Sequence, residues 1–268
     1  MPELPEVETI KKDLEKSILG RSIKKIEVSK PRIIKEPNPE RFKRELKGKT
    51  FRRIVRRGKY LIFYLSPRKF LIIHLRLTGQ LIYGEKDSKN RLNLLLSNNK
   101  YLNLNSRRML TEARLVDDWK KIPGITKLGY EPLSQVFSLD VFRQGINKKK
   151  KNIKAVLMDQ TFIAGVGNIY SQEALFWAKI DPRRPACSLN KQEVKRLHTV
   201  LKKILRDAVK CRGSSISDYT DARGRKGSFH SRIKVYGRKG QACLRCGKEL
   251  KKVVIEGRTT CFCPRCQR

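Results

Sequence analysis

Two pairs of cysteines near the end of the sequence constrain the fold of this 268-residue chain more than any other feature. Each pair has the spacing Cys-x2-Cys, and sixteen residues separate the pairs. A pair supplies two thiolates from one turn, and the segment between the pairs can fold as a hairpin that brings all four around one tetrahedral zinc ion. Because four sulfurs leave no open coordination position, this metal is expected to be structural. The expected ligands are Cys243, Cys246, Cys263 and Cys266.

The segment between the cysteine pairs predicts two strands, at 250–255 and 259–262, joined by a turn that carries Arg258. The side chain of Arg258 should project outward from this turn. A guanidinium group there can bind a phosphate through a forked pair of hydrogen bonds, although the position also fits a solvated surface arginine. We interpret Cys261 as a small packed side chain rather than a fifth metal ligand.

The charge of the chain indicates a polyanionic partner. Lysine and arginine number 63 against 25 aspartate and glutamate residues, which gives a formal net charge of +38. Such an excess steers association with nucleic acid and makes binding fall steeply with salt. The sequence lacks both a long apolar run and a basic leader followed by an apolar segment, so we expect neither a transmembrane helix nor a secretion signal. The cysteine pattern favours a reducing cytoplasm over a disulfide framework.

The spacing of apolar residues changes along the chain and indicates several structural regions. Helical spacing from Val7 to Ile18 predicts a first helix, and a period of two over 22–117 predicts an antiparallel sandwich or barrel. Proline and glycine interrupt the pattern at 120–150, which we interpret as an interdomain connection. The stretch 212–232 is rich in glycine, serine and arginine and is expected to be a mobile loop. Further helices are expected at 153–158, 168–178 and 190–208.

The first residues suggest covalent chemistry. The chain opens Met1-Pro2-Glu3, and loss of Met1 would leave the secondary amine of Pro2 beside a carboxylate. Such an amine titrates near about 8 and can attack a sugar carbon to form an iminium ion, which stays cationic because proline has no second proton to lose. From these residues alone, a proline that merely begins a helix is the more common interpretation.

Three motifs together resemble bacterial formamidopyrimidine-DNA glycosylases: the opening Met1 to Thr9, the segment Gly165 to Tyr170, and Val235 to Gly240 followed by the cysteines. The resemblance spans the whole chain and implies an α+β multidomain fold. An antiparallel β-sandwich with a leading helix would occupy 1–130. A helix-two-turn-helix DNA-binding domain would occupy 131–220, with an interdomain linker at 131–150. A lesion loop and a C-terminal zinc-finger β-hairpin would occupy 221–268.

The resemblance also implies the activity and its residues. The family excises oxidised purines such as 8-oxoguanine and formamidopyrimidines from duplex DNA, and then cuts the strand by β,δ-elimination. Carried over, Pro2 would attack C1′ and form a Schiff base, and Glu3 would manage protons on the sugar. Lys59 would assist elimination, and Arg258 would hold phosphate beside the lesion. The expected protein is a monomeric bifunctional glycosylase and lyase with one structural zinc ion, acting on damaged DNA in the cytoplasm at the nucleoid.

A further set of residues is expected to contact DNA because it matches positions in the family. His74 and Asn168 would bind phosphate, although on sequence alone His74 fits a core histidine and Asn168 fits a helix cap. Arg225 and Lys226 lie in a loop that resembles the lesion-covering loop. The full set is His74, Leu77, Arg107, Met109, Lys149, Asn168, Arg225 and Lys226.

The wedge that fills the space left by an extruded base departs from the family pattern. It maps onto Leu77, Arg107 and Met109. Leucine stands at position 77, where methionine is common, and Arg107-Arg108-Met109-Leu110 replaces Arg-Arg-Phe-Gly. Since methionine stacks less well than phenylalanine, the preference for the opposing base stays open.

Three alternative functions remain. An endonuclease VIII-type glycosylase would act on oxidised pyrimidines, which a comparison of 8-oxoguanine with thymine glycol would reveal. A non-catalytic, zinc-containing DNA-binding protein would bind tightly without cutting. A ribosome-associated basic protein would prefer RNA to lesion DNA.

Overall fold

The computed structural model describes residues 2–88 and 90–268, and the chain divides into two compact units. The first unit contains Met1–Thr126 and Val209–His230, and the second contains Lys127–Ala208 and Ser231–Arg268. Met1, whose loss is expected to expose the secondary amine of Pro2, lies outside the described residues. Among the described helices, none combines the length and apolar character needed to span a membrane.

The first unit begins with the predicted helix, α1 (Leu4–Ile18). Its apolar stripe is completely buried at Val7, Ile10 and Leu14, as helical spacing predicts. Proline in the first turn and a capping box at the N-terminus fix where the helix starts.

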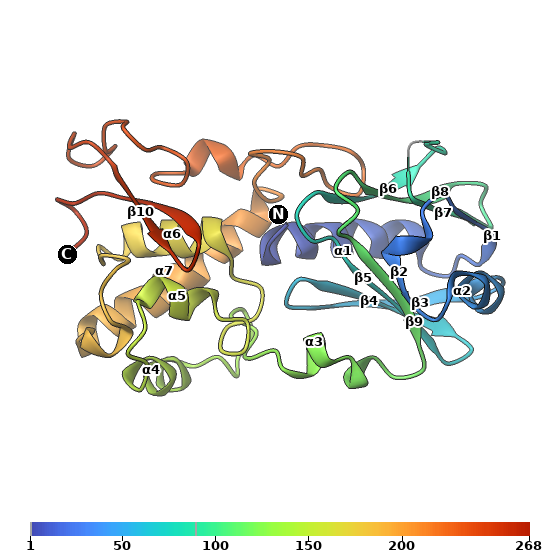
Figure 1. The fold of residues 1–268 in the computed structure, drawn as a ribbon, viewed down its shortest axis with the longest axis horizontal. Helices are drawn as coiled ribbons and strands as arrows, with labels where there is room; N and C mark the ends of the chain where they lie inside the picture. The colour runs from blue at the N-terminus through green and yellow to red at the C-terminus, as the bar shows by residue number, and fades with distance from the viewer. Residues whose placement is uncertain (1, 89) are drawn as a thin grey trace. The chain divides into compact units, whose positions relative to one another are not determined.

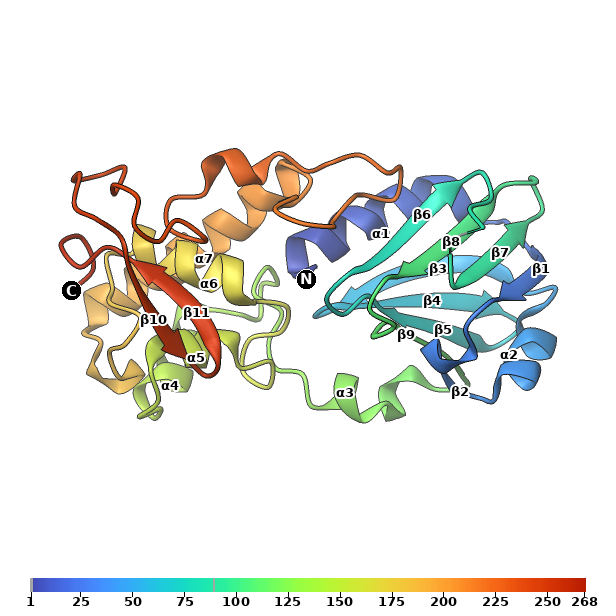
Figure 2. The ribbon, with the colours of Figure 1, turned by 45° about the horizontal axis from the view of Figure 1, so that its top comes forward.

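Two sheets form the sandwich of the first unit and share one apolar core with α1 (Figures 1 and 2). The five-stranded sheet has the order β2-β9-β5-β4-β3, and the four-stranded sheet has the order β1-β7-β8-β6. All neighbouring strands are antiparallel except the short strand β2, which pairs with β9 in parallel. The strands are β1 (Ile23–Val28), β2 (Ile34–Glu36), β3 (Thr50–Arg57), β4 (Tyr60–Ser66), β5 (Lys69–His74), β6 (Gly79–Gly84), β7 (Leu92–Leu96), β8 (Tyr101–Ser106) and β9 (Glu112–Val116).

Short helices and one long segment complete the first unit. The helical elements are η1 (Pro31–Ile33), α2 (Pro39–Leu46), η2 (Trp119–Lys121) and α3 (Pro123–Thr126). The long segment is 209–230. The stretch 212–232 was expected to be a mobile loop, but Tyr219 and Ala222 within it belong to the core of the sandwich. The sequence did not reveal these two core residues, because two apolar side chains in a stretch rich in glycine, serine and arginine form no repeated pattern.

The second unit is helical and carries the cysteine hairpin. Its elements are α4 (Leu139–Asn147), α5 (Ile153–Met158), α6 (Asn168–Trp177), η3 (Ala186–Ser188), most of α7 (Lys191–Lys210), part of η4 (Phe229–Arg232), β10 (Lys251–Ile255) and β11 (Arg258–Phe262). The strands β10 and β11 pair antiparallel as predicted, and the hairpin lies beside α6 (Figures 1 and 2).

Helix α4 lies inside the stretch 131–150, which the family resemblance gave as an interdomain linker. Ser138 caps the helix by accepting a hydrogen bond from the N–H of Val141. Phe142 and Ile146, four residues apart, are completely buried. Leu139, Phe142 and Ile146 do have helical spacing, but Pro132 and Gly145 interrupt the surrounding pattern, and the sequence interpretation followed those interruptions.

Candidate functional site

The N-terminal end of α1 holds the proposed nucleophile in the first unit. Pro2 and Glu3 are both buried. The backbone N–H of Glu3 donates to Glu6 Oε2 at 2.8 Å within the capping box. The second oxygen of the Glu6 carboxylate, Oε1, accepts a hydrogen bond from the N–H of Ser214 at 2.8 Å. Glu6 therefore links the start of the chain to the segment 209–230, a role that sequence reasoning missed.

Gly213 allows this link to form. Its φ is +81°, and a Cβ atom at this position would lie 2.8 Å from Glu6 Oε1. Any side chain would therefore both strain the backbone and push the carboxylate away from Ser214. The burial of Tyr219 and its proximity to Glu6 raise the pKa of the Tyr219 phenol, so this hydroxyl stays protonated and donates to the carbonyl of Arg212 at 3.0 Å.

A charged cluster anchors the loop that carries Arg225 and Lys226. Arg212 pairs with both Asp13 of α1 and Asp221. Asp221 also accepts the backbone N–H of Arg225 at 2.9 Å and the side chain of Arg225 at 3.2 Å. Burial raises the pKa of Asp221, but the N–H of Arg225 and the guanidinium of Arg212 outweigh it and leave this pKa below its usual value. The loop that carries Arg225 and Lys226 is thus attached through Asp221 to Arg212 and α1.

Lys59 lies in the turn between β3 and β4 and is 8% exposed. Gly58, with a φ of +55°, makes this tight turn possible. Arg56 ties the turn to α1, because its guanidinium donates to Glu8 Oε2 at 2.8 Å and to the carbonyl of Gly58 at 2.9 Å. The same helix therefore positions both Pro2 and the hairpin of Lys59.

His74 is the last residue of β5. Its Nδ1 accepts the backbone N–H of Arg76 at 3.0 Å, and its ring packs edge-on against Tyr60 at 4.4 Å between centroids. Arg76 has a φ of +55°, which ends the strand. Burial, with the charges of Arg76 and Lys59, lowers the pKa of His74 to about 3. The imidazole is therefore neutral, and with Nδ1 as acceptor its proton lies on Nε2, where it can be donated to a phosphate.

The expected wedge residues lie on two loops of the first unit that contact one another. The N–H of Arg108 donates to Thr78 Oγ1 at 3.4 Å. Leu77 is exposed, and Arg107 pairs with Asp218 at 2.8 Å on the surface. Met109 has a φ of +54° and packs partly into the sandwich core.

Asn168 is the first residue of α6 rather than its cap, because Gly167 occupies the N-cap position. Its side chain accepts hydrogen bonds from Lys154 Nζ at 2.6 Å and from Gln172 Nε2 at 3.0 Å, and donates to the carbonyl of Thr259 at 3.3 Å. The cap interpretation is therefore wrong: the asparagine joins α6 to β11. Lys154 and Gln172, neither predicted from the sequence, position it.

Lys149 and Arg258 line one open cavity of the second unit. Its volume is about 540 Å³, and it is also lined by Lys151, Asp159 and Glu256. Lys149 pairs with Asp159 at 3.1 Å. Arg258 is exposed and follows a two-residue turn in which Glu256 and Gly257 both have positive φ, as the tight turn of a hairpin requires.

The four predicted cysteines converge in the second unit. Their Sγ atoms all lie within 4.8 Å of one another, with 4.0 Å from Cys243 to Cys266 and 3.5 Å from Cys246 to Cys263. A tetrahedral zinc ion with bonds of about 2.3 Å separates its sulfur ligands by roughly 3.8 Å, so the four thiolates fit this ion. Cys261 is buried outside this cluster, as predicted.

Glu173 of α6 holds the start of the motif Val235 to Gly240 in place. This role was also missed by sequence reasoning. Its buried carboxylate accepts the backbone N–H groups of Lys234, Val235 and Tyr236 at 2.9 to 3.0 Å. Burial raises the pKa of this carboxyl group. The segment that enters the zinc hairpin is thus attached to the helix that begins at Asn168.

Comparison with known proteins matches all three modules. Residues 1–113 match the formamidopyrimidine-DNA glycosylase N-terminal domain, and 128–220 match its H2TH domain. Residues 240–268 match a zinc finger found in FPG and IleRS. The cysteine site therefore binds one structural zinc ion.

Individual relatives match along the whole chain. The formamidopyrimidine-DNA glycosylase of Desulforamulus reducens is 38% identical over 275 residues, which cover 100% of this chain and 99% of the relative. The crystal structure of MutM (Fpg) from Thermus thermophilus has a TM-score of 0.90 at 37% identity and covers 99% of this chain and 98% of that one. A crystal structure of the Lactococcus lactis FPG (MutM) in complex with DNA containing Fapy-dG has a TM-score of 0.91 at 37% identity, with 99% of this chain and 100% of that one covered.

The chain contains, in this order, a sandwich preceded by Pro2, an H2TH domain and a zinc hairpin. Together they define a zinc-containing protein of the base-excision class. The chain belongs to the formamidopyrimidine-DNA glycosylase family.

Proposed function

We propose that this protein removes oxidised purines, such as 8-oxoguanine and formamidopyrimidines, from damaged duplex DNA as a monomer, and then cuts the strand. The observation that carries the proposal is the buried Pro2-Glu3 start, held by the capping box of α1 in a member of this family. A non-catalytic DNA-binding protein or a ribosome-associated protein would have no use for a buried Pro2-Glu3 start.

The first step uses the imino nitrogen of Pro2. Its lone pair attacks C1′, the bond to the damaged base breaks, and the base leaves with its electron pair and gains a proton. The sugar ring opens to an iminium ion on Pro2, and Glu3 holds and transfers protons on the sugar. The Glu6 carboxylate keeps the backbone of Glu3 in place during this step.

The iminium cation then drives strand cutting. Loss of a proton from C2′ expels the 3′ phosphate by β-elimination, and a second elimination expels the 5′ phosphate. Lys59 lies beside Pro2 in the proposed mechanism, where its ammonium group stabilises the departing phosphates. Water finally releases the sugar fragment from Pro2.

The remaining predicted residues bind and deform the DNA. His74 donates its Nε2 proton to a phosphate, while Asn168, Arg258 and Lys149 bind phosphates from the second unit. Leu77, Arg107 and Met109 fill the space that the extruded nucleotide leaves. Arg225 and Lys226 cover the extruded base.

Two broader expectations belong to the same proposal. The functional division follows 1–130, 131–220 and 221–268, with catalysis in the first part, and the protein works in the cytoplasm at the nucleoid. The zinc ion holds the hairpin of Arg258 and takes no part in the chemistry, because its four thiolates close the coordination sphere.

Borohydride reduction on a duplex that contains 8-oxoguanine tests the proposal. The parent should form a covalent adduct, and Pro2→Gly should form far less of it while still binding DNA. Preferential trapping on thymine glycol would instead assign the pyrimidine activity of the endonuclease VIII type.

A further inference from the structure

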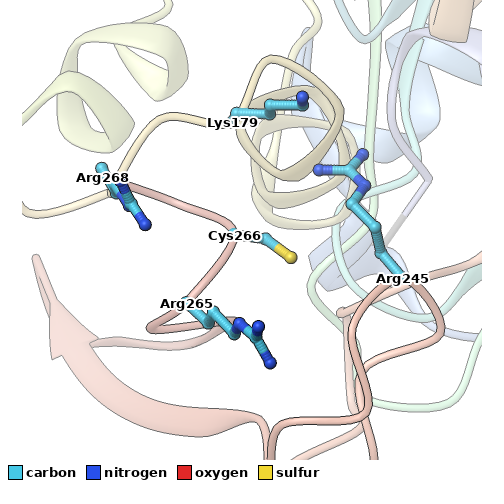
Figure 3. A pocket seen from close by; sticks show the side chains of 5 residues that line it. All are labelled: Lys179, Arg245, Arg265, Cys266 and Arg268. Atoms are coloured by element: carbon cyan, nitrogen blue, oxygen red, sulfur yellow. The ribbon is translucent and has the colours of Figure 1, made fainter.

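A second basic cavity lies in the zinc-binding part of the second unit. Its volume is about 310 Å³, and its lining consists of Lys179, Arg245, Arg265, Cys266 and Arg268. Figure 3 shows the four cationic side chains arranged around Cys266. No acidic residue lines the cavity, and among the described residues none of these four cations forms an ion pair with a carboxylate.

Packing and backbone hydrogen bonds fix the segments that carry these cations. The guanidinium carbon of Arg245 lies 4.3 Å from the centre of the Phe176 ring and 5.5 Å from that of Trp177. Arg245 also donates to the carbonyl of Phe176 at 3.3 Å. The N–H of Arg268 donates to the carbonyl of Lys179 at 3.3 Å. The guanidinium of Arg245 is thus held at the cavity before any anion binds, which lowers the entropic cost of its part in binding.

The negative charge of the zinc site does not balance all of the positive charge of these side chains. A zinc ion with four thiolates carries a net charge of about −2, and Cys266 places this charge at the cavity. Four lysine and arginine side chains carry +4, which exceeds the charge of the zinc–thiolate group, so the side chains that line the cavity keep a net positive charge for an external anion. The volume equals roughly ten water molecules at about 30 Å³ each, which is enough room for a phosphate group.

We propose that this cavity is a second phosphate-binding site, and that it binds a backbone phosphate of DNA. Arginine forks match the geometry of phosphate oxygens, and three of the four cations are arginines. The assignment to DNA rests on the proposed function, whereas phosphate binding itself follows from the cavity alone.

The cavity is separate from the phosphate contact assigned to Arg258. Strand β11 runs from Arg258 to Phe262 and leads into Cys263. At about 3.3 Å per residue, these five residues place the hairpin tip roughly 17 Å from the cysteine end. A phosphate in the cavity is therefore a different one from the phosphate at the tip, so the site adds a contact rather than duplicating one.

The test compares the zinc-loaded parent with R265Q/R268Q. A matched control, K195Q/K203Q, also removes two positive charges, from exposed positions on α7. Nuclear magnetic resonance follows the indole N–H of Trp177 during titration with inorganic phosphate, with chloride at equal ionic strength as reference. Affinity for an undamaged duplex is then measured over a range of salt concentrations.

We expect a saturable response to phosphate in the parent and the control, and at least a tenfold weaker one in R265Q/R268Q. The slope of log affinity against log salt should become shallower by about one in R265Q/R268Q, as for the loss of one phosphate contact, and by less in the control. Loss of the phosphate response with an unchanged slope would support the site but overturn its assignment to DNA. No saturable response in the parent would overturn the proposal.

Zinc content and borohydride trapping on 8-oxoguanine DNA are measured on every variant. Intact trapping in R265Q/R268Q separates this site from the proposed chemistry. Loss of zinc from R265Q/R268Q would mean that these arginines serve the metal site. Lys179→Gln, outside the cysteine pairs, then repeats the titration, and a parent-like phosphate response in this variant would overturn the proposal.

Discussion

The backbone N–H of Glu3 donates to the carboxylate of Glu6 at 2.8 Å, and this bond fixes the first residues of the chain against α1. The other oxygen of Glu6 accepts the N–H of Ser214 at 2.8 Å. The Glu6 carboxylate thus holds both the start of the chain, with Pro2, and the segment 209–230 in place. Two backbone groups far apart in sequence, at 3 and 214, depend on it.

Glu6→Gln should therefore weaken both folding and excision. A glutamine amide has only one oxygen, so one of the two buried N–H groups would face an NH2 donor, at a cost of about 1 to 3 kcal/mol. Excision of 8-oxoguanine should fall at least tenfold. Glu15→Gln is the control, because Glu15 lies on the same helix and, among the described residues, pairs only with Lys11 at the helix surface. Equal behaviour of the two variants in denaturant unfolding and excision assays would contradict this role.

His74 should make the protein less stable in acid. The unfolded chain binds a proton near pH 6.5, whereas the folded chain does so only near pH 3. Stability therefore falls as the pH drops from about 6.5 toward 3, by at most about 1.4 kcal/mol per pH unit from this residue. His74→Gln should flatten this dependence in urea unfolding measured between pH 7 and 4. The same slope in parent and variant would show that His74 titrates normally.

Lys59→Ala should impair strand cutting more than lesion binding. Loss of one positioned charged group should slow cutting by about 100-fold, so an abasic product should accumulate before the nick. Lys59→Arg is the informative comparison, because arginine keeps the charge but cannot release a proton. If Lys59→Arg cuts at the parent rate, charge alone is required. Parent-like cutting by Lys59→Ala would remove Lys59 from the mechanism.

Removal of zinc should unfold the hairpin β10–β11 and abolish lesion binding while the sandwich of the first unit stays folded. The thiolates repel one another without the ion, and the small apolar cluster around Cys243 and Cys263 is too small to hold the hairpin alone. Resonances of the two units, followed during chelation, check this. Unchanged DNA affinity in the zinc-free protein would contradict the role of Arg258.

The sequence predicted those parts of the molecule that depend on local patterns. Helix α1, the paired strands and the zinc hairpin each follow from a repeated spacing of apolar residues or cysteines. Lys149 and Lys59 were named from the family resemblance, and Arg258 from its place in the hairpin turn together with that resemblance. Their roles stay predictions.

The parts that the sequence could not predict depend on contacts between distant residues. The bond from Glu6 to Ser214 and the three bonds to Glu173 join segments far apart in sequence, and no local spacing signals them. Asparagine at position 168 is a residue type typical of a helix cap, but its side chain forms hydrogen bonds with Lys154 and Thr259 instead.

The most direct test of the central claim is mass spectrometry of the borohydride-reduced adduct with 8-oxoguanine DNA. The account predicts a peptide that lacks Met1 and carries the sugar fragment on the nitrogen of Pro2. A sugar on Lys59 or another lysine, or an active protein that retains Met1, would contradict it.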